Sequence, residues 1–108
     1  MANEKNIVVL VTAKNAIEAE TIARALLEKK LAACCNMIDG VRSLFHWEGK
    51  ICDEREVLLI IKTRRILFNS LEKAIRAVHS YETPEIIALP ITAGSAAYLK
   101  WLRESVLL

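Results

Sequence analysis

Two unbroken apolar runs stand out in the pattern of hydrophobic and polar positions along the chain. Residues 7–11 have the sequence IVVLV, and residues 57–61 have the sequence VLLII. Continuous β-branched and aliphatic side chains, without polar alternation, are typical of a strand that is buried on both faces. The sequence therefore predicts two central strands, one near the start of the chain and one near its middle.

Three further segments repeat apolar residues at helical spacing, which places those residues on one face of a helix. The first begins at Asn15, three residues before Glu18, an arrangement similar to a capping box, and it ends near Lys29. The third begins after Ser95, a residue suited to an N-cap. The apolar positions are Ala19, Ile22, Ala23, Leu26 and Leu27 in the first segment, Leu67, Leu71, Ala74, Ile75 and Val78 in the second, and Tyr98, Leu99, Leu102 and Val106 in the third.

Between the first two predicted helices, the pattern changes to that of a long β-hairpin over residues 32–63. Val41, Ser43, Phe45 and Trp47 are expected on one face of the strand and Arg42, Leu44 and His46 on the other, and Glu48 and Gly49 supply the turn. The hairpin is long, since strands in globular proteins usually run roughly 3–10 residues. We therefore expect its tip, residues 41–54, to extend beyond the rest of the domain.

The last predicted strand covers residues 85–91. Pro90 within it indicates a sheet edge or a strand end, because proline cannot donate a hydrogen bond to a neighbouring strand. The resulting order, βαββαβα, is that of a split βαβ fold in which the first and third strands are central. We therefore expect a single α+β domain over residues 1–108, a ferredoxin-like βαββαβ sandwich with a long β-hairpin and a C-terminal helix.

The composition shows an excess of apolar residues. Of the 108 residues, 54% are hydrophobic, above the roughly 45–50% of ordinary domains. A small domain has little interior to hold that excess, so self-association is the simplest way to bury it. A net charge of +2 with 26% charged residues argues against nucleic-acid binding. The longest apolar runs are too short to span a membrane.

The three cysteines fit packing roles better than metal ligation. Cys34 and Cys35 are adjacent on a predicted strand, so their side chains point to opposite faces. Cys52 is expected opposite Phe45 in the hairpin, far from both. An odd number of cysteines without a disulfide framework suits a reducing compartment, which predicts a cytoplasmic protein.

Two interpretations stay open for His79, at the predicted end of the second helix. Its cationic form would interact favourably with the helix dipole, or its imidazole could ligate a transition metal. His46 is interpreted as a surface or interface residue of the hairpin. Neither histidine has a second ligand at metal-binding spacing, and one histidine cannot make a closed metal site. Because the sequence also lacks a glycine-rich phosphate loop and a GxSxG motif, no enzymatic activity is predicted.

The outer hairpin carries apolar side chains that its own protomer cannot cover. Long exposed strands also present unpaired backbone groups that favour pairing with another chain, and a closed cyclic assembly satisfies them. We therefore expect Phe45 and Trp47 to lie against an adjacent subunit as interface anchors.

Lys62 ends the second apolar run and requires a partner if it is buried. The sequence offers two kinds of partner: a carboxylate, or an anionic ligand stacked on an aromatic ring. The candidate carboxylates are Glu56, Glu82 and Glu85, and the candidate rings are Tyr81 and Trp47.

Several segments together resemble the CutA divalent-cation-tolerance family, and they span nearly the whole chain in order. They are LEKKLAAC at residues 27–34, WEGKI at 47–51, LIIKT at 59–63, YETPEIIALPI at 81–91 and YLKWL at 98–102. The resemblance implies a ferredoxin-like protomer in a tight homotrimer, similar in assembly to PII-type signalling proteins. It also implies a role in tolerance of, or response to, divalent metal ions, with copper the usual candidate, and no enzyme reaction.

The resemblance also implies two sites. Some members bind copper through a strand cysteine and a histidine pair; this chain has Val11 at the first position, so His79 alone carries over as a ligand. Copper(II) or another divalent cation is therefore expected to bind weakly and not to be required for folding. A cleft between subunits is implied for Trp47, Glu56, Lys62, Tyr81 and Glu82.

Two functions follow from these observations. The first is a homotrimeric module that binds metal ions or a small anionic ligand and signals their presence. The alternative is a structural or interaction protein whose trimer is a platform for a partner and has no ligand of its own.

Overall fold

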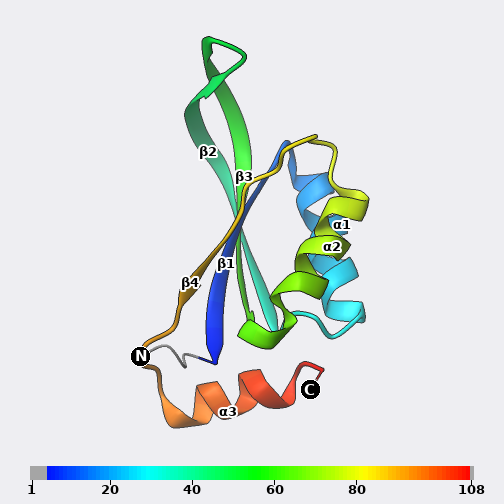
Figure 1. Ribbon diagram of the computed structural model, residues 1–108, viewed down its shortest axis with the longest axis vertical. Helices are drawn as coiled ribbons and strands as arrows, with labels where there is room; N and C mark the ends of the chain where they lie inside the picture. The colour runs from blue at the N-terminus through cyan, green and yellow to red at the C-terminus, as the bar shows by residue number, and fades with distance from the viewer. Residues whose placement is uncertain (1–4, 108) are drawn as a thin grey trace.

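The computed structural model of the protein describes residues 5–107; residues 1–4 and 108 of the predicted domain lie outside the described residues. A four-stranded antiparallel sheet has the order β2-β3-β1-β4 (Figure 1). The predicted ferredoxin-like α+β fold is confirmed, with β1 and β3 in the middle of the sheet. The elements are β1 (Asn6–Ala13), α1 (Ala16–Glu28), β2 (Cys34–Trp47), β3 (Lys50–Arg64), the 3-10 helix η1 (Arg65–Leu67), α2 (Phe68–Val78), β4 (Ile86–Pro90) and α3 (Ala96–Glu104).

Helices α1 and α2 lie on the same side of the sheet and form the core with it (Figure 1). Alternate residues of β1 and β3 face these helices, as the two-residue period of a strand requires. Helix α3 crosses the lower end of the sheet (Figure 1). Leu102 of this helix and Val106, which follows it, are buried. The fully buried core side chains include Val9, Val11, Leu59 and Ile61 from the sheet and Ile22, Leu26, Leu71 and Ile75 from the helices.

The opposite face of the sheet carries a cluster of aliphatic side chains but has no layer of helices among the described residues. The prediction that both central strands are buried on both faces is therefore wrong for the single chain. The two crossover helices lie on one side, so Val8 and Leu10 of β1 and Leu58 and Ile60 of β3 stay partly exposed. The aliphatic side chains of this uncovered sheet face are Val8 and Leu10 of β1, Leu58 and Ile60 of β3, Ile87 and Leu89 of β4, and Ile38 of β2.

The β2–β3 hairpin extends beyond the body of the domain, as predicted (Figure 1). Its turn is Glu48–Gly49, and both residues have positive φ, 50° and 77°. Two central residues with positive φ match the right-handed twist of the flanking strands, which explains the two-residue connection. Cys52 pairs with Phe45, as the sequence predicts.

A β-bulge in β2, which the sequence analysis missed, decides which side chains share a face of the hairpin. The pairing advances from Ile38↔Leu58 to Val41↔Glu56, so β2 carries one extra residue, and Gly40 in the bulge has φ 74°. Because side chains alternate along a strand, one extra residue moves the odd-numbered residues of β2 onto the uncovered face. The bulge thereby places Phe45 and Trp47 on the same side of the hairpin as Glu56.

The ends of α1 combine a predicted and an unpredicted feature. At the N-terminus, Asn15 Oδ1 accepts a hydrogen bond of 2.8 Å from the Glu18 amide, which confirms the predicted cap. At the C-terminus, Lys30 has φ 56°, and the amides of Lys30 and Leu31 donate to the carbonyls of Leu27 and Leu26. These two bonds form a Schellman motif, in which glycine is the usual residue with positive φ.

We predict that Lys30→Gly stabilises the protein. The left-handed conformation costs a residue with a Cβ atom roughly 1–2 kcal/mol, part of which the greater freedom of glycine in the unfolded chain offsets. The measurement is the midpoint of chemical unfolding. Lys29→Gly is the matched control, because Lys29 has φ −85° and gains nothing from glycine; equal effects of the two changes would contradict the prediction.

Candidate functional site

A cleft lies where the hairpin leaves the body of the domain, and we refer to it as the hairpin cleft. It consists of two adjoining hollows of about 390 and 610 Å³ that share Phe45, Trp47, Tyr81 and Thr83. The hairpin forms one wall, and the loop between α2 and β4, residues 79–85, forms another. The other lining residues are Lys14, Cys52, Glu54 and Glu82 in the first hollow and Thr12, Arg42, Ser43, Leu44, His46, Glu56, Pro84 and Glu85 in the second.

A hydrogen bond joins the two walls of the hairpin cleft. Tyr81 Oη donates to Glu56 Oε2 over 2.8 Å, and Glu56 itself is buried. Burial and this carboxylate raise the pKa of Tyr81 well above its ordinary value, so the phenol keeps its proton. Burial also raises the pKa of Glu85, with a further contribution from the negative charge of Glu56. The cleft thus holds these groups close to neighbouring carboxylates.

His79 fixes the start of the cleft loop from inside the protein. Its side chain is fully buried, with Nε2 lying 2.8 Å from the Thr12 carbonyl oxygen and Nδ1 lying 3.0 Å from the Tyr81 amide nitrogen. Because the amide donates to Nδ1, the proton of the neutral ring is on Nε2 and is donated to Thr12. These two hydrogen bonds connect Thr12, at the end of β1, to Tyr81, which lines the cleft.

Glu18 makes a second connection to the same loop. Its Oε2 accepts a hydrogen bond of 2.8 Å from the Ser80 amide, and its Oε1 accepts one of 3.0 Å from the Lys14 amide. Burial alone would raise the pKa of Glu18, but the hydrogen bonds from Ser80 and Lys14 outweigh it and lower that pKa below its ordinary value. Its Oε1 lies 4.0 Å from His79 Nδ1, but the two do not form an ion pair while Nδ1 accepts the hydrogen bond from the Tyr81 amide.

Four of the five predicted cleft residues meet in the structure. Trp47, Tyr81 and Glu82 line the first hollow, and Trp47, Tyr81 and Glu56 line the second. Lys62 does not join them: it lies six residues along β3 from Glu56, roughly 20 Å at 3.3 Å per residue.

Lys62 instead contacts β2, where it donates to Asn36 Oδ1 and lies 3.8 Å from Cys34 Sγ. An amide oxygen thus takes the place of the carboxylate that the sequence suggested. The anionic ligand was predicted because of the charge of Lys62, so within one chain the hairpin cleft lacks that cation.

The described residues contain no ready-made metal centre. Among residues 5–107, no group of three or more His, Cys, Asp or Glu side chains is placed to hold a metal ion. The two nitrogens of His79, the predicted copper ligand, are already hydrogen-bonded. Cys34 and Cys35 face opposite sides of the sheet as predicted, and Cys35 packs against the core. Burial raises the pKa of Cys35 to about 12, so it stays a thiol.

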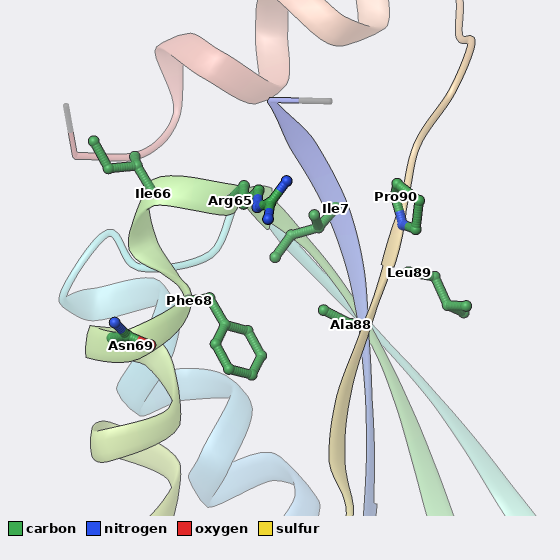
Figure 2. A pocket seen from close by; sticks show the side chains of 8 residues that line it. All are labelled: Ile7, Arg65, Ile66, Phe68, Asn69, Ala88, Leu89 and Pro90. Atoms are coloured by element: carbon green, nitrogen blue, oxygen red, sulfur yellow. The ribbon is translucent and has the colours of Figure 1, made fainter. Parts of the chain in front are cut away.

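A separate pocket of about 540 Å³ lies at the other end of the sheet, between the start of α2 and β4 (Figure 2). Ile7 and Phe68 extend into this space, whereas Leu89 points away from it (Figure 2). The only charged residue in its described lining is Arg65. The hairpin cleft, with its carboxylates and aromatic rings, is therefore the candidate functional site.

The sequence analysis missed the role of the Glu18 carboxylate and the presence of Lys14 and Thr83 in the cleft. The capping-box pattern predicted a bond to the Glu18 amide, which the structure confirms, but gave no sign that its carboxylate binds Ser80, 62 residues away. Pairs that far apart in sequence leave no local periodicity, so no pattern within a single segment reveals them.

The sequence matches the profile of a known protein family. The sequence profile of the CutA1 divalent ion tolerance protein matches residues 7–105. The chain belongs to the CutA1 divalent ion tolerance family. Its resemblance to CutA proteins, first seen in short segments, thus extends over β1 to α3.

Similar CutA proteins occur in bacteria and plants. The divalent-cation tolerance protein CutA of Thermus thermophilus is 45% identical over 98 residues, which cover 91% of this chain and 95% of that protein. The chloroplastic CutA protein of Arabidopsis thaliana is 47% identical over 100 residues, which cover 93% of this chain and 55% of the plant protein. The chain thus spans about half the length of the plant relative.

Solved CutA structures share the fold closely. The divalent cation tolerance protein from Thermus thermophilus superposes with a TM-score of 0.92 at 44% identity, covering 94% of this chain and 98% of that one. CutA1 from Oryza sativa gives a TM-score of 0.93 at 44% identity, covering 95% and 94% of the two chains. In the described part of this chain, no helix combines the length and apolar character needed to cross a membrane.

We predict that Glu18→Gln destabilises the protein by about 1–3 kcal/mol at pH 7, because it removes the charge from two buried hydrogen bonds. The folded-state pKa of Glu18 is lowered, so its stabilisation is present above the ordinary value of 4.5 and is lost as the pH falls through the lower folded value.

The difference in unfolding free energy between the wild type and Glu18→Gln should therefore shrink between pH 7 and pH 3. Chemical unfolding at several pH values measures it. Glu20→Gln is the control, because Glu20 is on the same helix and its ion pair with Arg24 is exposed. A difference between the wild type and Glu18→Gln that stays constant with pH would show that the charge of Glu18 is not what stabilises the loop.

Proposed function

We propose that the protein is a homotrimeric divalent-cation tolerance and response protein that acts as a binding and signalling module and not as an enzyme. The observation that carries this proposal is the uncovered sheet face, whose seven partly exposed aliphatic side chains come from all four strands. Membership of the CutA1 family supports the role in divalent ion tolerance. The hairpin cleft supports ligand binding.

The uncovered sheet face gives the chain a strong reason to assemble. Ile87, Leu89 and Ile38 remain 51%, 50% and 46% exposed. Burying a large aliphatic side chain contributes roughly 1.5–3 kcal/mol, so covering this face would add several kcal/mol. A second layer of helices would do this in a larger protein, and copies of the same chain do it here. A closed ring of three leaves no open surface for further growth.

The hairpin adds a second contact region to this assembly. Phe45 and Trp47 line the cleft of their own chain and are still 38% and 44% exposed. Their remaining surface supports the prediction that an adjacent subunit packs against them. The cleft would then lie at a boundary between subunits, where a ligand is able to report on the assembly.

Divalent ions, copper among them, are the proposed signal. The family description supports this assignment, and His79 is the imidazole that corresponds to a copper ligand in the resemblance. Coordination by His79 would have to displace the hydrogen bond from the Tyr81 amide or that to the Thr12 carbonyl. Binding through one chain is therefore weak, and folding does not depend on the metal. Three free thiols support a cytoplasmic location.

A specific observation also favours the alternative, an interaction platform without a ligand of its own. Leu44 and Ile51 are 64% and 74% exposed on the other face of the hairpin, away from Phe45 and Cys52. Exposed aliphatic side chains on an extended hairpin suit the docking of a partner protein. Changing Ile51, which lies outside the cleft lining, to serine would abolish partner binding and leave the trimer and the cleft intact.

We predict that Ile60→Asp lowers the mass of the particle in light scattering, because a charge in the centre of the uncovered sheet face opposes its burial. Ile87→Asp, on the edge strand, should act in the same direction with less risk to folding. Ile17→Asp is the control: Ile17 is 79% exposed but lies on α1, so the mass should not change. If Ile60→Asp and Ile87→Asp fold and keep the mass of the wild type, this face is not the interface.

We also predict weak Cu(II) binding that depends on His79. Calorimetric titration should show a reduced affinity in His79→Ala and an unchanged one in His46→Ala, which removes the exposed histidine of the hairpin. Circular dichroism checks that the first variant is folded. An unchanged affinity in folded His79→Ala would remove His79 from the copper site and point to the cysteine thiols.

A further inference from the structure

The hairpin cleft combines aromatic rings with carboxylates. Phe45, Trp47 and Tyr81 line the first hollow together with Glu54 and Glu82. The adjoining hollow contains the same three rings together with Glu56 and Glu85. Neighbouring segments of the hairpin and the loop 79–85 thus present three rings and four carboxylates to one continuous space.

The formal charges of this lining favour a cation. The lining contains two basic side chains, Lys14 and Arg42, and four carboxylates. Arg42 is already neutralised, because its Nε and Nη2 donate to the two carboxylate oxygens of Asp53 over 3.0 and 2.7 Å. Lys62, whose charge suggested an anionic ligand, contacts Asn36 and Cys34 elsewhere on the sheet.

The titration behaviour of the lining agrees with this charge balance. Burial is the main cause of the raised pKa values of Tyr81 and Glu85, and neighbouring carboxylates raise them further. A bound positive charge would relieve the repulsion among these groups.

The chemistry of the lining distinguishes an organic cation from a metal ion. Small divalent ions need several oxygen, nitrogen or sulfur ligands around one point, and no such group of three is found among residues 5–107. Aromatic rings attract a cation whose charge is spread over a larger surface, such as an alkylammonium or a guanidinium. Carboxylates at the margin add a longer-range attraction.

We propose that the hairpin cleft binds a small organic cation, an alkylammonium or a guanidinium, which contacts the Trp47 and Phe45 rings and is attracted by the surrounding carboxylates. This inference rests on the proposed function, in which the cleft is a ligand site, and it names the class of ligand. Trp47 is the residue that contributes most to the contact, since indole has the strongest attraction for cations among the aromatic side chains.

The test uses tetramethylammonium as the probe and Trp47 as the reporter. Trp101, the second tryptophan, is 45% exposed on α3 and is changed to phenylalanine so that the fluorescence comes from Trp47 alone. tert-Butyl alcohol is the matched neutral probe of similar size, and inorganic phosphate is the anionic one. Each probe is titrated into the full-length protein, and calorimetry repeats the measurement without relying on fluorescence.

Tetramethylammonium should bind at least about tenfold more tightly than tert-butyl alcohol, and added salt should weaken it. By calorimetry, Trp47→Leu, which keeps an apolar side chain without a ring, should lower the affinity about fivefold, and Trp47→Phe should restore part of it. Glu54→Gln should also lower it, whereas Glu72→Gln, on α2 and outside the cleft lining, should not.

Equal binding of the charged and neutral probes, or an affinity unchanged in folded Trp47→Leu, would overturn the proposal, as would the absence of tetramethylammonium binding. Binding of phosphate in the cleft without tetramethylammonium would overturn the cationic class but leave the cleft a ligand site. Failure of the proposed function is seen separately, in the particle mass of the variants of the uncovered sheet face and in the copper titration.

Discussion

The structure depends on one constraint: its sheet carries aliphatic side chains on both faces, but the two long helices of the described residues cover only one. Val9 and Leu59 face α1 and α2 and are fully buried, whereas Val8 and Leu58, their neighbours in sequence, stay partly exposed. The isolated protomer therefore leaves apolar surface exposed to water, and the hydrophobic effect favours its burial. The composition already indicates this excess, and the topology determines where it lies.

The second organising feature is the bulge at residues 38–41, which links the sheet to the candidate site. One extra residue in β2 turns Phe45 and Trp47 toward the same side as Glu56. The cleft loop then approaches that side and is held by the Tyr81–Glu56 bond, while His79 and Glu18 anchor it from within. In the proposed function, the hairpin lines the cleft and also contacts an adjacent subunit, so a ligand bound in the cleft would have a direct physical route to influence the contacts between subunits.

Local patterns predicted the fold well because they act through neighbouring residues. The two apolar runs identified the central strands, Asn15 and Ser95 identified two helix starts, and Glu48–Gly49 identified the turn. The bulge was missed, because residues 34–47 have no regular polar–apolar alternation whose phase an inserted residue would shift. The meeting of Trp47, Glu56, Tyr81 and Glu82 was expected from the family resemblance. The separation of Lys62 follows from its place six residues along β3 from Glu56, a spacing that the sequence already contains.

The central claim, that copies of the chain cover the uncovered sheet face, is tested most directly by sedimentation equilibrium of the unmodified protein at micromolar concentration. The account predicts one species with three times the 12.1 kDa mass of the protomer, unchanged on dilution across the micromolar range. A stable, folded species with the mass of a single protomer would contradict it.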